Sequence, residues 1–165
     1  MRRWIRLGIA ICCCTLVLAE AGCATRRREE FGRPRNVPSI VPLDVATYRI
    51  SSHYGMRNGR PHKGVDLNVP KGTPVLAAAD GIVLFAGKGR DFGRIVKLCH
   101  ANGTETWYAH LKSFRVGERD RVRQGERIGR VGKSGNATGP HLHYEVHVKG
   151  QPVNPEPYLN GKGRP

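Results

Sequence analysis

Two short motifs hold side chains that can ligate a metal and move protons. Residues 62–66 read His-Lys-Gly-Val-Asp, and residues 141–145 read His-Leu-His-Tyr-Glu. Imidazole and carboxylate are both ordinary zinc ligands. In the first motif they lie four residues apart, on a turn that we expect to lead into a strand. Taken alone this pair is a weak signal, because the spacing recurs by chance.

The second motif is more informative. In a strand, residues two apart point to the same face, so His141, His143 and Glu145 are predicted to share one face. Leu142 and Tyr144 would then face the other way. Two neighbouring imidazoles in an apolar core would be costly without partners. The motif therefore predicts a polar site rather than a core position.

The elements that must position these motifs are short strands. From about Ala46 the sequence holds short apolar runs bounded by Gly, Pro, Asn or Asp, and no window sustains a helical apolar stripe. Asn102-Gly103 separates two such runs and predicts a hairpin with a type I′ turn. The chain has 21 Gly and 11 Pro, which suits many tight turns. We predict one all-β domain, a sandwich or barrel.

Four motifs in a fixed order carry a family resemblance. They are Gly-Arg-Pro-His62-Lys-Gly-Val-Asp66, Gly-Thr-Pro-Val-x-Ala-x-x-Asp80-Gly81, Tyr108-Ala-His110-Leu and Gly132-x-Ser-Gly-x-x-Thr-Gly-Pro-His141-Leu-His143-Tyr-Glu-Val. This series resembles the LytM/lysostaphin-like zinc metallopeptidases, over roughly residues 51–159. The resemblance implies an antiparallel β-sheet groove with the duplicated hybrid motif. It also implies hydrolysis of peptide cross-links in bacterial peptidoglycan, either polyglycine bridges or direct D-alanyl-diaminopimelate links.

The resemblance assigns roles to five residues. His62, Asp66 and His143 would hold one Zn²⁺ per chain, and His110 and His141 would be the two further active-site histidines. Three protein ligands leave a position for water, as a catalytic zinc requires. We expect His141 to be the general base and His110 to act on the oxyanion or the leaving group. The reverse division stays open.

The other histidines have simpler interpretations. His100, beside the predicted turn, is expected to be structural, and His53 and His147 are expected on the surface or along the groove. Glu145 either holds a histidine tautomer from behind or forms a salt bridge at the edge of the core.

Other residues near the motifs, aromatic and cationic, are expected either at the substrate groove or in the core. Tyr54 and Arg57 are expected at the edge of the substrate groove, whereas Trp107 and Tyr108 are expected in the core.

Two other functions are compatible with parts of the sequence. Domains of this kind that have lost zinc ligands act as non-enzymatic activators of cell-wall amidases, but this chain keeps all five positions. The Gly-Thr-Pro-Val stretch also resembles lipoyl carriers and phosphocarriers. An export signal and Asp66 argue against a cytoplasmic phosphocarrier.

The N-terminus predicts export. A basic start, an apolar run from Leu7 to Leu18 and small residues after it are typical of a signal peptide over 1–22. Ala21-Gly22-Cys23-Ala24 favours a lipoprotein signal with lipidation of Cys23, although Glu20 departs from that pattern. Ordinary cleavage after Ala19-Glu20-Ala21 and an uncleaved anchor are the alternatives. A linker over 23–45, the peptidase-like domain over 46–159 and a tail over 160–165 would follow.

Charge and cysteines bear on the partners. The net charge is +15, which favours polyanions, but export argues against nucleic acid. Peptidoglycan carboxylates and anionic lipid are the expected partners, with an outer-membrane lipoprotein facing the periplasm favoured over a secreted periplasmic protein. If Cys23 is lipidated, Cys99 is a lone thiol. Without lipidation, a Cys23–Cys99 bridge is conceivable.

Overall fold

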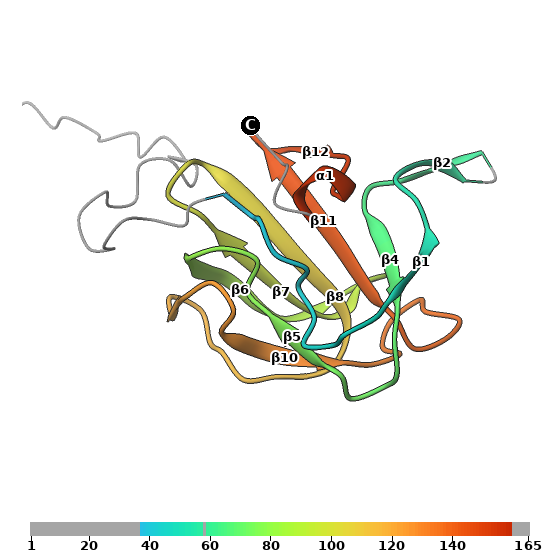
Figure 1. Ribbon diagram of the computed structural model, residues 1–165, viewed down its shortest axis with the longest axis horizontal. Coiled ribbons are helices and arrows are strands. Elements are labelled where there is room, and N and C mark those ends of the chain that lie inside the picture. The colour runs from blue at the N-terminus through green and yellow to red at the C-terminus, as the bar shows by residue number, and fades with distance from the viewer. Residues whose placement is uncertain (1–36, 58, 160–165) are drawn as a thin grey trace, which may run out of the picture.

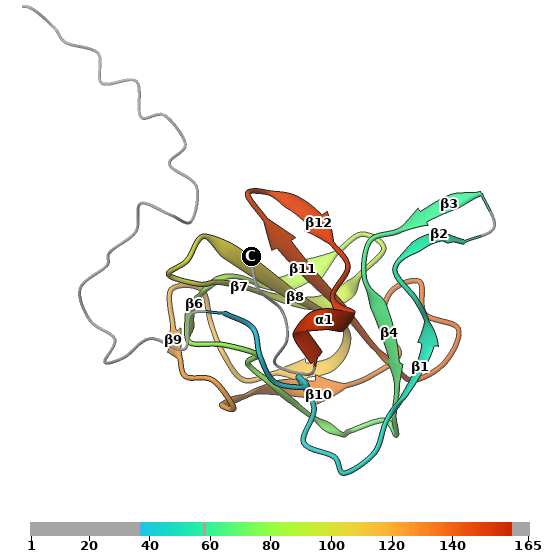
Figure 2. The ribbon, with the colours of Figure 1, turned by 45° about the horizontal axis from the view of Figure 1, so that its top comes forward.

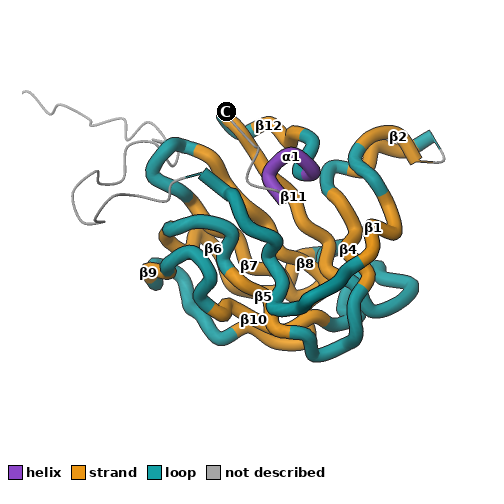
Figure 3. The backbone as a smooth tube through the Cα atoms, viewed as in Figure 1, coloured by secondary structure: helices purple, strands orange, loops and turns teal. Residues whose placement is uncertain are grey.

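The computed structural model describes residues 37–57 and 59–159. Nearly all regular structure in these ranges is β-strand, with one short helix (Figure 3). The elements are β1 Arg49–Ser52, β2 Gly55–Arg57, β3 Arg60–His62, β4 Val65–Asn68, β5 Pro74–Leu76, β6 Gly81–Gly89, β7 Gly93–Cys99, β8 Thr104–Phe114, β9 Arg121–Val122, β10 Arg127–Val131, β11 Leu142–Val148, β12 Gln151–Val153 and α1 Glu156–Leu159. The predicted all-β antiparallel fold is confirmed.

Ten of these strands form one antiparallel sheet. Its main path runs β1-β4-β11-β8-β7-β6-β9, while β10 pairs with β5 and β8, and β12 pairs with β11 (Figure 1). Strands β2 and β3 form a separate hairpin that projects from the body of the molecule beyond β1 and β4 (Figure 2). Strand β11 therefore lies between β4 and the long strand β8, and these three adjacent strands carry most of the site.

Strand β11 alternates as its sequence predicts. Leu142, Tyr144 and Val146 are completely buried in the apolar core. His143 and Glu145 point to the opposite face, which is also buried. The polar face of β11 is therefore shielded from water, and its side chains need hydrogen-bond partners within the protein.

The β7–β8 connection is a hairpin, but its turn type differs from the prediction. The N–H of Gly103 bonds to the carbonyl of His100 at 2.9 Å, and the N–H of His100 bonds to Thr104. Only Gly103 has a positive φ, 80°, whereas a type I′ turn needs two such residues. The loop is a three-residue connection with glycine in the left-handed position, and Asn102 caps it by accepting bonds from Thr104.

The end of the predicted linker packs on the domain. Leu43 is 4% exposed and bridges Val75 of β5, and the N–H of Leu76 bonds to the carbonyl of Pro42. The part of the 23–45 segment from residue 37 onward thus belongs to the folded unit, earlier than the expected start at Ala46. Among the described residues, no helix is long and apolar enough to cross a membrane.

The predicted signal segment 1–22, Cys23 and the tail 160–165 lie outside the described residues. Cys99, on β7, is 8% exposed. Cys99 is disulfide-bonded. The lone-thiol expectation is therefore not met.

Candidate metal centre and active site

Three side chains from three strands place their ligand atoms together. His62 ends β3, Asp66 lies on β4 and His143 lies on β11. Nε2 of His62 is 3.2 Å from Oδ1 of Asp66 and 3.2 Å from Nδ1 of His143. Nδ1 of His143 is 2.8 Å from the same Asp66 oxygen. These atoms all lie within 4.8 Å of one another, so two imidazoles and a carboxylate present one converging donor set, which fits zinc.

The backbone brings these strands together closely at Gly64. Asp66 and His143 are directly paired across β4 and β11. A Cβ at Gly64 would lie 2.4 Å from the carbonyl oxygen of Tyr144 and 3.0 Å from the ring of His143. Only glycine allows this approach, which explains the glycine within the His-Lys-Gly-Val-Asp motif.

Each of the two candidate ligand histidines is held from behind by a hydrogen-bond acceptor. Nδ1 of His62 lies 2.7 Å from the carbonyl oxygen of His53, which leaves Nε2 for the metal position. Nε2 of His143 lies 2.9 Å from Oε1 of Glu145, which leaves Nδ1. Such partners fix the tautomer and orientation of metal-binding imidazoles. Of the two predicted interpretations of Glu145, the contact to His143 corresponds to the first.

His110 reaches the site through a β-bulge. Between the pairs Arg94–Leu111 and Val96–Tyr108, strand β7 has one residue and β8 has two. His110 has φ 60°, and β8 changes partner there from β11 to β10. In a regular strand His110 would follow Tyr108 to the core. The bulge redirects its side chain, as bulges near active sites do.

A loop after β10 anchors the redirected histidine. The carbonyl of Ser134 accepts a bond from Nδ1 of His110 at 2.8 Å. The Ser134 hydroxyl accepts from the N–H of Arg94 and donates to the carbonyl of Leu111, so it clamps both sides of the bulge. These bonds give the serine of the Gly-x-Ser-Gly motif a positioning function, which its place in the sequence motif does not reveal.

His141 lies directly beside the three candidate ligands. Its Nδ1 is 3.0 Å from the carbonyl of Gly139, and its Nε2 is 3.7 Å from Oδ1 of Asp66. The ring centroids of His110 and His141 are 4.8 Å apart. With Nδ1 donating to a carbonyl, a neutral ring presents Nε2 as a proton acceptor in both residues.

Burial and hydrogen bonds act in opposite directions on the charged groups. Burial raises the pKa of Asp66, but bonds from His143 and His62 outweigh burial and hold this pKa well below its usual range. Burial lowers the pKa of His143, yet bonds to Asp66 and Glu145 raise it to about 9. For His110, burial is the largest influence and lowers the pKa to about 4. His110 is therefore neutral near pH 7.

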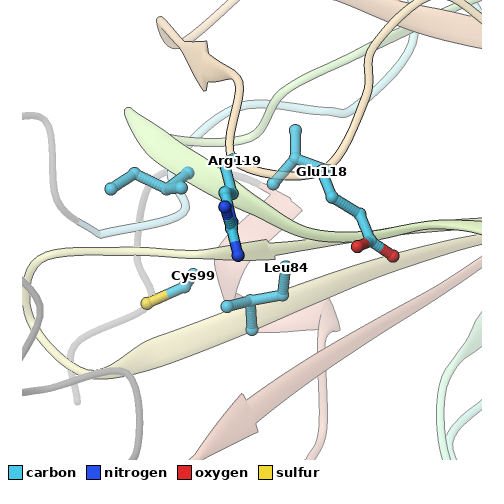
Figure 4. Close-up of a pocket in the computed structure, with 6 residues that line it drawn as sticks. Leu84, Cys99, Glu118 and Arg119 are labelled. Atoms are coloured by element: carbon cyan, nitrogen blue, oxygen red, sulfur yellow. The ribbon is translucent and has the colours of Figure 1, made fainter.

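The five predicted residues line one open pocket. It also includes a phenyl ring, polar loop residues and charged groups at its rim: Arg57, Arg60, Pro61, Asp91, Phe92, Asn136 and Thr138. Arg57, which is expected at the groove edge, is one of these lining residues. A second hollow, at β6 and β7, is lined by Leu84, Cys99, Glu118 and Arg119 among others and holds none of the site histidines (Figure 4).

His147 and His100 are two buried histidines outside the candidate ligand set. His147 was expected on the surface or in the groove, but it is 6% exposed and bonds to Glu145 at 2.6 Å. Its ring stacks on Trp107 at 4.3 Å. His100 is structural as predicted, with Nδ1 bonded to the carbonyl of Asp80 and Nε2 to Thr106. Period-two spacing from His143 through Glu145 could have placed His147 with them.

This arrangement matches a known family. The profile of peptidase family M23 covers residues 60–155. The chain belongs to peptidase family M23. It is 51% identical over 123 residues to DD-carboxypeptidase/endopeptidase Mpg of Neisseria meningitidis serogroup B, covering 71% of this chain and 28% of that protein. It is 40% identical over 120 residues to peptidoglycan DD-endopeptidase ShyA of Vibrio cholerae, covering 68% and 28%.

Solved structures of M23 peptidases agree in fold. The catalytic domain of lysostaphin from Staphylococcus simulans superposes with a TM-score of 0.65 at 34% identity, over 68% of this chain and 92% of that one. A zinc-containing peptidase from Vibrio cholerae gives a TM-score of 0.68 at 32% identity, over 76% and 40%. The chain spans less than a third of the length of the curated relatives it matches.

Proposed function

We propose that this M23 domain is a zinc-dependent endopeptidase that hydrolyses peptide cross-links of peptidoglycan in the cell envelope. The observation that carries the proposal is the convergence of His62, Asp66 and His143 in one pocket with His110 and His141. A site built only to hold a structural metal would be closed. Here the ligand set opens onto a pocket with two further imidazoles.

The protein groups divide into holding and proton-moving residues. His62, Asp66 and His143 would hold Zn²⁺, which when bound polarises a carbonyl and acidifies water. His110 and His141 line the same pocket with their ring centroids 4.8 Å apart, and an imidazole can accept a proton and donate it afterwards. We keep His141 as the proposed general base and His110 on the oxyanion or leaving-group side, because a histidine whose pKa is lowered to about 4 is a weak proton acceptor near pH 7.

We further propose that the bond cut is a D,D cross-link. Two relatives carry that bond type in their names, Mpg and ShyA. In a direct link between D-alanine and diaminopimelate, the carbon that bears the scissile amide nitrogen also carries a carboxylate. A polyglycine bridge has no such group.

Digestion of purified peptidoglycan tests the proposal. The zinc-loaded full chain should release uncrosslinked peptides, identified by mass spectrometry, and His62→Ala and His143→Ala should lose both zinc and this activity. Release of nothing by zinc-loaded protein, together with stimulation of a cell-wall amidase, would establish the activator function instead.

A further inference from the structure

The β2–β3 hairpin brings two arginines to the rim of the site. Arg57 and Arg60 are the cationic Lys or Arg side chains among the residues that line the pocket. They are directly paired across the hairpin, and the same strand β3 ends at the ligand His62. The hairpin stands off the sheet beside β4 (Figure 2), and both of its arginines are among the residues that line the pocket.

This pairing is unfavourable without an anion. Like charges directly opposite each other on neighbouring strands repel. Arg57 is partly compensated, since Nη1 donates to Ser52 at 3.1 Å and lies 3.4 Å from Oδ2 of Asp66. Arg60 has no side-chain hydrogen bond or ion pair with any described residue. The hairpin therefore holds a guanidinium with unused donors at the mouth of the site.

The two carboxylates of the pocket lining, Asp66 and Asp91, help to decide which side of the pocket attracts an anion. Arg57 forms an ion pair with Asp66, whose charge would be shared with the metal when zinc is bound. Asp91, the other carboxylate of the pocket lining, belongs to the β6–β7 connection rather than to the hairpin. The hairpin side of the pocket is thus the side that attracts an anionic group.

The geometry points to a carboxylate-binding subsite formed by Arg57 and Arg60, which recognises the free carboxylate on the residue that supplies the scissile amide nitrogen. Guanidinium groups suit planar carboxylates because they present paired donors. The inference rests on the proposed function and specifies its substrate: anionic direct cross-links are preferred over polyglycine or amidated links.

Two matched peptides test the subsite. One is a D-alanyl-diaminopimelate cross-linked peptide with the free carboxylate, and the other has that carboxylate amidated. Zinc-loaded wild-type protein should cut the acid faster. Arg60→Gln should lower kcat/KM for the acid by about 10-fold, the effect of losing one charge-assisted hydrogen bond, and leave the amide within about twofold. Arg60→Lys should retain part of the preference.

The controls separate this inference from the proposed function. Arg115→Gln removes an exposed arginine outside the pocket and should change neither rate. Arg57→Gln should act like Arg60→Gln, with zinc content measured because Arg57 contacts Asp66. Equal wild-type rates on both peptides, or equal losses on both in Arg60→Gln, would overturn the subsite. Cleavage of neither peptide by wild type would overturn the proposed function itself.

Discussion

Glu145 is predicted to tune the zinc affinity from behind the site without touching the metal. Its carboxylate is 1% exposed and lies between Nε2 of His143 at 2.9 Å and Nε2 of His147 at 2.6 Å. Burial raises the pKa of Glu145, but these two bonds outweigh burial and lower the pKa to about 2. An ionised Glu145 therefore orients His143 and increases the basicity of the ligand nitrogen.

Two substitutions separate charge from hydrogen bonding. Glu145→Gln keeps an acceptor for His143 but removes the charge, and we expect zinc affinity to fall about 10-fold, or about 1.4 kcal/mol. Glu145→Ala also strands two buried imidazole nitrogens. We expect a loss of affinity nearer 100-fold and, at about 1–3 kcal/mol for each unsatisfied group, a lower stability of the metal-free protein.

The assay is competition for zinc against a chromophoric chelator, with denaturant unfolding of the metal-free protein measured in parallel. Glu105→Gln is the matched control, because Glu105 lies on the neighbouring strand opposite His147 and bonds to Trp107 rather than to a ligand. Wild-type affinity in Glu145→Ala, or an equal loss in Glu105→Gln, would refute the reasoning.

Three further predictions follow from separate features. His110→Ala and His141→Ala should each keep zinc, while the rate on a cross-linked peptide falls about 10²–10⁴-fold. The loss of rate in the double variant should be smaller than the product of the two single losses. Loss of zinc from His141→Ala would show instead that His141 is a ligand. Burial lowers the pKa of His100 to about 4, so as the pH falls the unfolded chain binds a proton at this histidine before the folded protein does. The free energy of unfolding should therefore fall by about 3 kcal/mol between about pH 6.5 and pH 4. Denaturant unfolding of His100→Gln should show a correspondingly weaker pH dependence. If Cys23 is lipidated, the native protein should be membrane-bound and Cys23→Ser should appear in the soluble fraction. A native protein whose intact mass includes no lipid, and whose Cys99 thiol appears only after reduction, would support the bridge instead.

Part of the geometry of the candidate ligand set has local signals in the sequence, although the resemblance and not the spacing named His62, Asp66 and His143 as ligands. The alternation of His143 and Glu145 against Leu142 and Tyr144 follows from strand geometry, and it holds in the structure. The sequence also predicts a turn before a strand at the His62–Asp66 motif, and in the structure β4 begins at Val65. What the sequence could not supply was the approach of β4 to β11, which depends on the missing Cβ at Gly64.

The second half of the site depends on features with no local pattern. Strand periodicity sends His110 to the same face as Tyr108, and only a bulge with a left-handed non-glycine residue reverses that direction. Such a conformation is unfavourable by about 1–3 kcal/mol and persists only where its surroundings enforce it. Here the enforcing group is Ser134, 24 residues further along the chain, which bonds both to His110 and to the strands on either side.

The division between predictable and unpredictable residues follows their roles. Residues proposed to hold the metal sit on regular strands, where geometry is rigid and repeats every two residues. His110, proposed to move protons, lies where that regularity is broken. Regular strand spacing would turn its side chain to the core face of β8, and the bulge turns it into the polar pocket instead. Replacing Ser134 should therefore disturb His110 while leaving His62, Asp66 and His143 in place, since none of those three bonds to the loop. The proposed metal centre and His110 are thus supported by different contacts, the first by the pairing of β4 with β11 and the second by the bulge in β8 and Ser134.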